Sequence, residues 1–387
     1  MQKKIIALAI AGLASTAAFA QTNVQIYGVV DAAIAYVNNS QGRDGMAVQS
    51  GVLAGNRLGF KGTEDLGNGL KAVFLLEQGF NLDDGSNTST TGQTFQRQAW
   101  VGLSSNAGTV SLGRQYAPGY AAFLKHDALA GALLSAGMTL NTAAANTIAG
   151  NSNARWNNSI KYATPVMGGF QAEAIYRAGE ASNDFASNEG YGLGLAYAGG
   201  PVAVNYVFHH TDGSASGSNG GNLYGQFVNS TPDTGAIRDE HFIGATFDAK
   251  VMKIMASAQF AENQGRGLDG RSSVELYTLG AIVPVGKGNL HANYGYLDLN
   301  GNDRKNGASG AGQSYAVAYT YGLSKRTTLY TAVNYTDLAG RSAAPSYALG
   351  AAGASAAASV VSAQNTANAI NGGGNGTTVG FGVNHSF

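Results

Sequence analysis

The last eleven residues, 377–387, read TTVGFGVNHSF and alternate between two kinds of side chain. The bulky or amphipathic positions are Val379, Phe381, Val383, His385 and Phe387, and the positions between them are small or polar. Alternation with a period of two predicts a β-strand that has one apolar face. Chain ends usually fray, so an apolar strand that ends on Phe387 predicts that this end of the chain is paired within a sheet.

The first twenty residues, MQKKIIALAIAGLASTAAFA, have the three parts of a secretory signal peptide. Lys3 and Lys4 form the basic start, an apolar run follows, and Ala18 and Ala20 give the small-x-small cleavage site. The apolar run is shorter than the ~20 residues that a spanning helix needs. We therefore expect residues 1–20 to be removed on export and residues 21–387 to form a single domain.

The composition favours many curved strands over helices. Charged residues make up 12% of the chain, about half the ~25% typical of a soluble domain, and the 56 Gly are roughly twice the usual share. The 19 Tyr and 15 Phe with only 6 Pro fit a barrel with aromatic girdles. Outside the first twenty residues no run is long enough for a spanning helix, so a membrane-embedded form would have to be a β-barrel.

The charge balance gives no indication of a nucleic-acid partner. Lys and Arg total 23, as do Asp and Glu, and removal of Lys3 and Lys4 would leave 21 basic against 23 acidic residues, a net charge of −2. Nucleic-acid binders usually have a clear basic excess. The chain has no Cys, so no disulfide stabilises the exported protein.

The turn residues divide the chain into strands of similar length. Short segments rich in Gly, Pro, Asn, Asp or Lys predict seven tight turns, at about 65–70, 104–110, 164–170, 198–202, 248–251, 284–289 and 322–327. Longer polar or small-residue segments predict eight loops, at about 38–54, 81–92, 116–153, 179–189, 212–238, 263–270, 299–311 and 338–376. Seven short turns alternating with eight long loops, with both termini on the short-turn side, predict sixteen antiparallel strands.

The polar side of these strands distinguishes a barrel from a soluble sandwich. In RWNNSIKYA the residues Trp156, Ile160 and Tyr162 are expected on one face. The alternate, polar residues are expected on the other face: Arg155, Asn157, Ser159 and Lys161. Such polar side chains could not be buried in a dry core without a large desolvation cost. An all-β transmembrane barrel, with water inside and lipid outside, accommodates both faces. The last strand must then pair with the first to remove the sheet edges, which would place Phe387 at a membrane boundary.

Several blocks of sequence follow one another over most of the chain: NRLGFKGTEDLGNGLKAVFLLEQGF, RQAWVGLSSNAGTVSLGRQY, ARWNNSIKYATPVMGGF, YGLSKRTTLYTAVNY and the terminal Phe. In this order they resemble the general diffusion porins of beta-proteobacterial outer membranes. The resemblance implies a homotrimer of sixteen-stranded barrels in the Gram-negative outer membrane, surrounded by lipid and lipopolysaccharide. It also implies short periplasmic turns, long extracellular loops, a third loop folded into the lumen, and passage of small hydrophilic solutes and ions without a cofactor.

In relatives of this family a ladder of basic residues on the barrel wall faces an acidic inward loop. By motif, the ladder here comprises Arg57, Arg97, Arg114 and Arg155, which we call the arginine ladder. The alternation supports an inward position for Arg57 and Arg155 and is equivocal for the other two. Arg114 shares the parity of outward-facing residues, so it needs a β-bulge, expected at Gly113, to turn inward.

The third long loop, residues 116–153, is rich in small apolar residues, which is typical of a segment packed inside a barrel. We call it the constriction loop. Its only acid is Asp127, next to Lys125 and His126, whereas relatives have several acids there. The predicted pore constriction therefore consists of the arginine ladder with Asp127 and Lys125, and we expect a mild preference for anions because nearby charges outweigh distant, screened ones.

Two other functions on the same barrel stay open from the sequence: a solute-specific channel, and a surface adhesin or receptor. An enzyme is not indicated. His209, His210 and Asp212 form the cluster HHTD, but adjacent residues of a strand point to opposite faces. No metalloprotease, serine hydrolase or phosphate-binding motif occurs.

Overall fold

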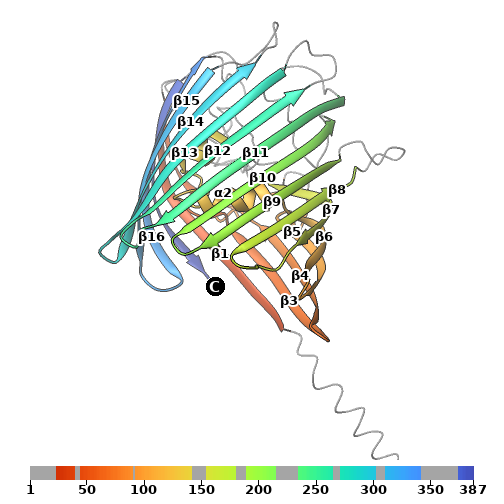
Figure 1. Cartoon of the computed structure of the whole chain (residues 1–387). Coiled ribbons are helices and arrows are strands. Elements are labelled where there is room, and N and C mark those ends of the chain that lie inside the picture. The colour runs from red at the N-terminus through yellow and green to blue at the C-terminus, as the bar shows by residue number, and fades with distance from the viewer. Residues whose placement is uncertain are drawn as a thin grey trace, which may run out of the picture.

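The chain folds into a closed antiparallel β-barrel with part of the chain packed inside it (Figure 1). The computed structural model describes residues 23–39, 44–89, 92–141, 154–179, 189–214, 234–264, 271–301, 310–340 and 374–387. The expected signal peptide and most of the loops at 212–238 and 338–376 lie outside the described residues.

The strands are β1 (Asn23–Asn39), β2 (Gly45–Ser50), β3 (Arg57–Gly67), β4 (Leu70–Gly79), β5 (Gln98–Ser105), β6 (Gly108–Tyr116), β7 (Arg155–Ala163), β8 (Phe170–Arg177), β9 (Gly190–Gly199), β10 (Val202–Ser214), β11 (Thr234–Asp248), β12 (Lys253–Gln264), β13 (Arg271–Val285), β14 (Gly288–Gly301), β15 (Gly310–Gly322), β16 (Thr327–Gly340) and β17 (Gly374–Ser386). The helices are α2 (Pro118–His126) and α3 (Ala136–Leu140). No helix among the described residues combines the length and apolarity needed to cross a membrane.

These strands occupy sixteen positions around the barrel, because β2 and β3 share one. β1 pairs with β3 along its first half, from Asn23 to Val29, and with β2 along its second half, from Ala32 to Val37. The predicted count of sixteen is confirmed. The prediction that 38–54 is a loop was wrong, because residues 45–50 form strand β2. Residues 51–56 separate β2 from β3, and Gly51 adopts a left-handed conformation there, with φ +69°.

The barrel closes where the sequence predicted, between the two ends of the chain. β1 pairs with β17 from Val29↔Ser386 to Asn39↔Gly376. Gly28 and Phe387 exchange two backbone hydrogen bonds, with N···O distances of 3.2 and 3.1 Å. The Phe387 ring lies against Gly28, where any Cβ atom would collide with it. No unpaired sheet edge is left at this seam.

The alternation of side chains follows the prediction on most strands. On β17 the outward residues Val379, Phe381 and Val383 are exposed, and Phe381 has 60% of its surface accessible. The prediction that Trp156 lies on the outward face was wrong, because its side chain is fully buried inside the barrel. The β6–β7 register shifts opposite Arg114, and Asn158 adopts a left-handed conformation with φ +49°, so the alternation on β7 is displaced at that point.

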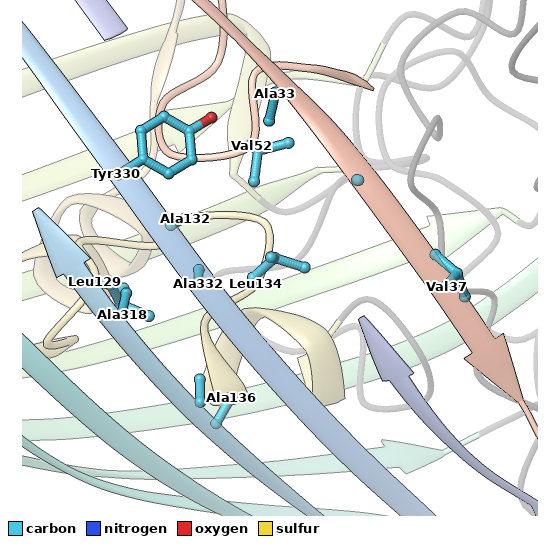
Figure 2. Close-up of a cluster of buried hydrophobic side chains, with 12 residues drawn as sticks. Ala33, Val37, Val52, Leu129, Ala132, Leu134, Ala136, Ala318, Tyr330 and Ala332 are labelled. Carbon is cyan, nitrogen blue, oxygen red and sulfur yellow. The ribbon is translucent and has the colours of Figure 1, made fainter. Parts of the chain in front are cut away.

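The constriction loop enters the barrel and packs on one part of its inner wall. Helix α2 contacts β8–β12 and helix α3 contacts β13–β16. Between the two helices, Leu129, Ala132 and Leu134 pack against inner-wall residues such as Ala318 and Ala332 (Figure 2). The loop's apolar composition is therefore explained by its burial. We call strands β8–β16 the covered wall and strands β3–β7 the open wall.

Candidate pore constriction

The arginine ladder lies on the open wall, near the ends of the strands that lead into the long loops. Arg57 begins β3, Arg97 immediately precedes β5, Arg114 lies near the end of β6, and Arg155 begins β7. Adjacent antiparallel strands bring these ends together. All four side chains are partly exposed, in contrast to the fully buried residues beneath the constriction loop.

Glu77 on β4 organises the first part of the ladder. Its Oε1 atom accepts a hydrogen bond from Arg97 Nε at 2.6 Å, and its Oε2 atom accepts one from the Tyr27 hydroxyl at 2.7 Å. Arg97 Nη2 also donates to the Tyr116 hydroxyl at 2.8 Å. Arg57 is close enough to act electrostatically on Glu77 and Tyr27. One carboxylate therefore connects Arg97 with two tyrosines, Tyr27 and Tyr116.

Two tyrosine rings hold the guanidinium group of Arg155. Its Cζ atom lies 5.1 Å from the ring centroid of Tyr116 and 5.7 Å from that of Tyr120. The two rings are themselves 4.7 Å apart. Cation–π contacts fix an arginine without neutralising it, so Arg155 keeps its full positive charge while its orientation is set by the start of the constriction loop.

The predicted bulge next to Arg114 is confirmed. Gly113 has φ +131°, and the β6–β7 register shifts between Gly113 and Gln115. Arg114 Nε donates to the Gln96 carbonyl oxygen at 2.6 Å, and Nη1 donates to Asn157 Oδ1. Both partners are neutral, and Arg155 lies within electrostatic range of Arg114. The four ladder arginines therefore lie near one another on the open wall, each held by its own partners.

Asp127 is not one of these partners. It is 2% exposed and accepts hydrogen bonds within and beneath the constriction loop, from Ser135 Oγ at 2.5 Å, Leu129 N at 2.9 Å, Gly131 N at 3.1 Å and Asn293 Nδ2 at 3.3 Å. Burial raises the pKa of Asp127 above its ordinary value. This placement does not fit the expected role of Asp127 as the charge that opposes the ladder, because the carboxyl stabilises the loop and does not face the passage. Lys125, at the end of α2, is exposed.

Sequence reasoning missed Glu77 and the tyrosines around it. Glu77 interrupts an apolar run, LKAVFLLEQG, at a position whose partner on β3 is Gly59, on the same face as Arg57 and Lys61. An acid at an inward position of an otherwise apolar strand was the pattern that could have identified it. Lys61 adds a further positive charge to the open wall, with Nζ 5.3 Å from the Tyr27 ring centroid.

Comparison with known proteins agrees with this architecture. A family model described as Gram-negative porin matches residues 7–341. The chain belongs to the Gram-negative porin family. It is 34% identical over 332 residues to outer membrane porin protein 32 of Delftia acidovorans, covering 85% of this chain and 88% of that protein. It is 29% identical over 389 residues to an outer membrane porin protein of Bordetella pertussis, covering 87% of this chain and 94% of that protein.

The solved structures show the same fold. An anion-selective porin from Comamonas acidovorans superimposes with a TM-score of 0.75 at 28% identity, covering 95% of this chain and all of that chain. OmpT, an outer membrane protein of Vibrio cholerae, superimposes with a TM-score of 0.63 at 16% identity, covering 95% of this chain and 98% of that chain. This porin is thus an outer-membrane barrel that crosses the bilayer with its strands and encloses an aqueous channel, as the sequence predicted.

Proposed function

We propose that this porin lets small hydrophilic solutes and ions diffuse through a passage between the open wall and the constriction loop, and that it prefers anions. The observation that carries the proposal is the imbalance of charge at the arginine ladder. Four arginines meet one paired carboxylate, Glu77, and the acid of the loop is buried. The anion selectivity named for the Comamonas acidovorans porin supports the same ion preference for this porin.

The range of the electrostatic force favours this local charge over the charge of the whole chain. At physiological salt, charges farther than about 8 Å from an ion are largely screened. A permeating ion therefore responds to the guanidinium groups beside it and not to a net charge spread over the barrel. Arg57, Arg114 and Arg155 form no ion pair with a carboxylate within the described part of the chain.

The two alternative functions, a solute-specific channel and a surface adhesin or receptor, have less support. A solute-specific channel would place a continuous track of aromatic rings along the lumen, but most exposed tyrosines, such as Tyr206 and Tyr315, face outward. Tyr116 and Tyr120 instead hold Arg155 in place. An adhesin would not need the constriction loop that packs inside this barrel.

The proposal extends to processing and assembly. We propose that residues 1–20 are a signal peptide and that residues 21–387 form the mature barrel. A homotrimer is supported by the Vibrio cholerae OmpT structure described as a trimer form, which shares 16% identity and the fold. The apolar outer face is suited to contact with membrane lipid, including lipopolysaccharide.

The double substitution Arg57→Ser and Arg155→Ser tests the proposed selectivity. Both side chains are partly exposed to the lumen, so we expect the reversal potential in a KCl gradient to move toward cation preference. The thermal stability of the protein should change little because neither arginine has a carboxylate partner to leave unpaired. A matched control is Lys253→Ser at the exposed pair with Asp248, which is away from the ladder. An unchanged ion preference in the double variant would contradict the assignment of the ladder.

A further inference from the structure

The first turn of α2 is capped by a histidine from the barrel wall. The residue before the helix, Ala117, has no side chain that can accept a hydrogen bond, and Pro118 follows it. Helix first turns leave backbone N–H groups without partners inside the helix. The N–H of Gly119 donates to Nε2 of His209 on β10, at 3.3 Å. The His209 ring is fully buried and packs against Trp156 at 5.0 Å between ring centroids.

This contact requires the neutral form of His209. Because Nε2 accepts a hydrogen bond, the ring hydrogen of the neutral imidazole is on Nδ1. Nδ1 has no hydrogen-bond partner among the described residues, and Glu240 Oε2 lies 3.8 Å away. A protonated imidazole has two donors and no acceptor, so it cannot accept from Gly119. It would also place a positive charge at the positive end of a helix, which is unfavourable.

Two other histidines form contacts between the constriction loop and the barrel wall, and neither contact requires a neutral imidazole. His126, at the end of α2, contacts Asn205 Oδ1 at 2.9 Å and Thr246 Oγ1 at 2.8 Å. His291 on β14 contacts the Ala128 carbonyl oxygen at 2.8 Å and Thr320 Oγ1 at 3.0 Å. All four partner atoms are oxygens that can accept a hydrogen bond, so protonation of either ring preserves its contacts. His209 is therefore the pH-sensitive contact of the three.

The charged groups around His209 come from strands β11 and β8. On β11, Glu240 lies beside Nδ1 and pairs with Arg238 Nε at 2.7 Å. On β8, Arg177 lies over the Trp156 ring at 5.3 Å. Glu240 places a negative charge beside the ring, and the two arginines place positive charges near it.

Within the part of the chain that the structure describes, the remaining elements against the ring contribute no charge at the contact. They provide Trp156 from β7, Gly192 from β9 and Gly119 from α2. Asp212, farther along β10, acts electrostatically on Arg177. Glu240 therefore lies beside Nδ1 in both forms of the ring, whereas the hydrogen that a protonated His209 gains is on Nε2, facing the Gly119 N–H.

We propose that His209 is a positioning residue for the constriction loop and that its protonation releases the first turn of α2. The inference rests on the proposed channel function, because its consequence is a change in conduction. Gly119 directly precedes Tyr120, which with Tyr116 fixes Arg155. Loss of the cap therefore loosens the start of the loop and the part of the arginine ladder that depends on it.

Single-channel recording of the full mature protein in planar bilayers tests this inference. The measurement is the frequency of transient closures in KCl between about pH 8 and about pH 5, the range in which histidine ordinarily titrates. We expect closures of the wild type to become about fivefold more frequent as the pH falls, the change in equilibrium that corresponds to one lost hydrogen bond. A wild type whose closures do not depend on pH would overturn the inference.

Two glutamine variants separate His209 from the other histidines. His209→Gln retains an acceptor for the Gly119 N–H at every pH, so its closures should stay as rare as those of the wild type at about pH 8. His291→Gln is the matched control and should keep the wild-type pH response. The same pH response in His209→Gln as in the wild type would overturn the inference.

A second measurement does not depend on a variant. Hydrogen exchange of residues 117–123 in the wild type, corrected for intrinsic rates, should accelerate as the pH falls, while exchange of β14 should not. The same pH dependence of hydrogen exchange in both segments would argue against the release of the first turn of α2. A protein that forms no conducting channel at about pH 8 would instead contradict the proposed function itself.

Discussion

Arg57 and Arg238 lie on facing sides of the barrel and differ in how far they are buried and in what they bind. Arg238, on the covered wall, is 1% exposed, and its Nε is 2.7 Å from Glu240 Oε1. Arg57, on the open wall, is partly exposed and donates to the backbone oxygen of Gly55 at 3.1 Å. The constriction loop covers one wall and leaves the other open to the passage. The same residue type is therefore part of the packed structure on one side and available to passing ions on the other.

The largest effect on stability should come from Arg238→Met. The substitution removes the guanidinium that is ion-paired with buried Glu240, and breaking a buried ion pair costs about 3–5 kcal/mol. We expect this loss of unfolding free energy in urea denaturation of the refolded barrel. Arg57→Met is the matched control on the open wall and should cost less than about 1 kcal/mol. Equal losses at the two positions would remove the distinction between the walls.

A change at Asp127 sharpens the comparison within the loop itself. Asp127→Asn keeps the shape but replaces one accepting oxygen by a donor that faces the hydroxyl of Ser135 or the amide of Asn293. We expect a loss of about 1–3 kcal/mol in unfolding free energy because buried polar groups lose their partners. The reversal potential in a KCl gradient should stay at the wild-type value. A clear shift toward anions would show that Asp127 acts on permeating ions after all.

The fold could be predicted from the sequence because a barrel wall repeats a simple pattern. Lipid on one side and water or loop on the other impose the same alternation on β1 and β17, and short turns set the strand count. Trp156 and the segment 45–50 could not be placed by that pattern. A local left-handed residue at Asn158 displaces the alternation, and an interruption at Gly51 leaves two strands, β2 and β3, in one position of the barrel.

The candidate site could be predicted in part. Motif matches placed Arg57, Arg114 and Arg155 on strands and Arg97 directly before one, positions that the register of the barrel fixes. Their role in ion selectivity stays a prediction. The direction of Asp127 could not be predicted, since it depends on how the loop folds back on Ser135 and Asn293. Nor could the role of His209, whose ring meets Gly119 across 90 residues of sequence.

The central claim is that the passage runs along the open wall while the constriction loop seals the covered wall. The chain contains no cysteine, so single cysteines introduced at Lys61 and at Ser314 can be compared directly. Lys61 faces the passage, whereas Ser314 is fully buried and accepts a hydrogen bond from Asn334 Nδ2 at 3.0 Å beneath the loop. Rates of modification by a charged, water-soluble thiol reagent should be high for Lys61→Cys and near zero for Ser314→Cys in the folded protein. Equal rates at the two positions would contradict the account.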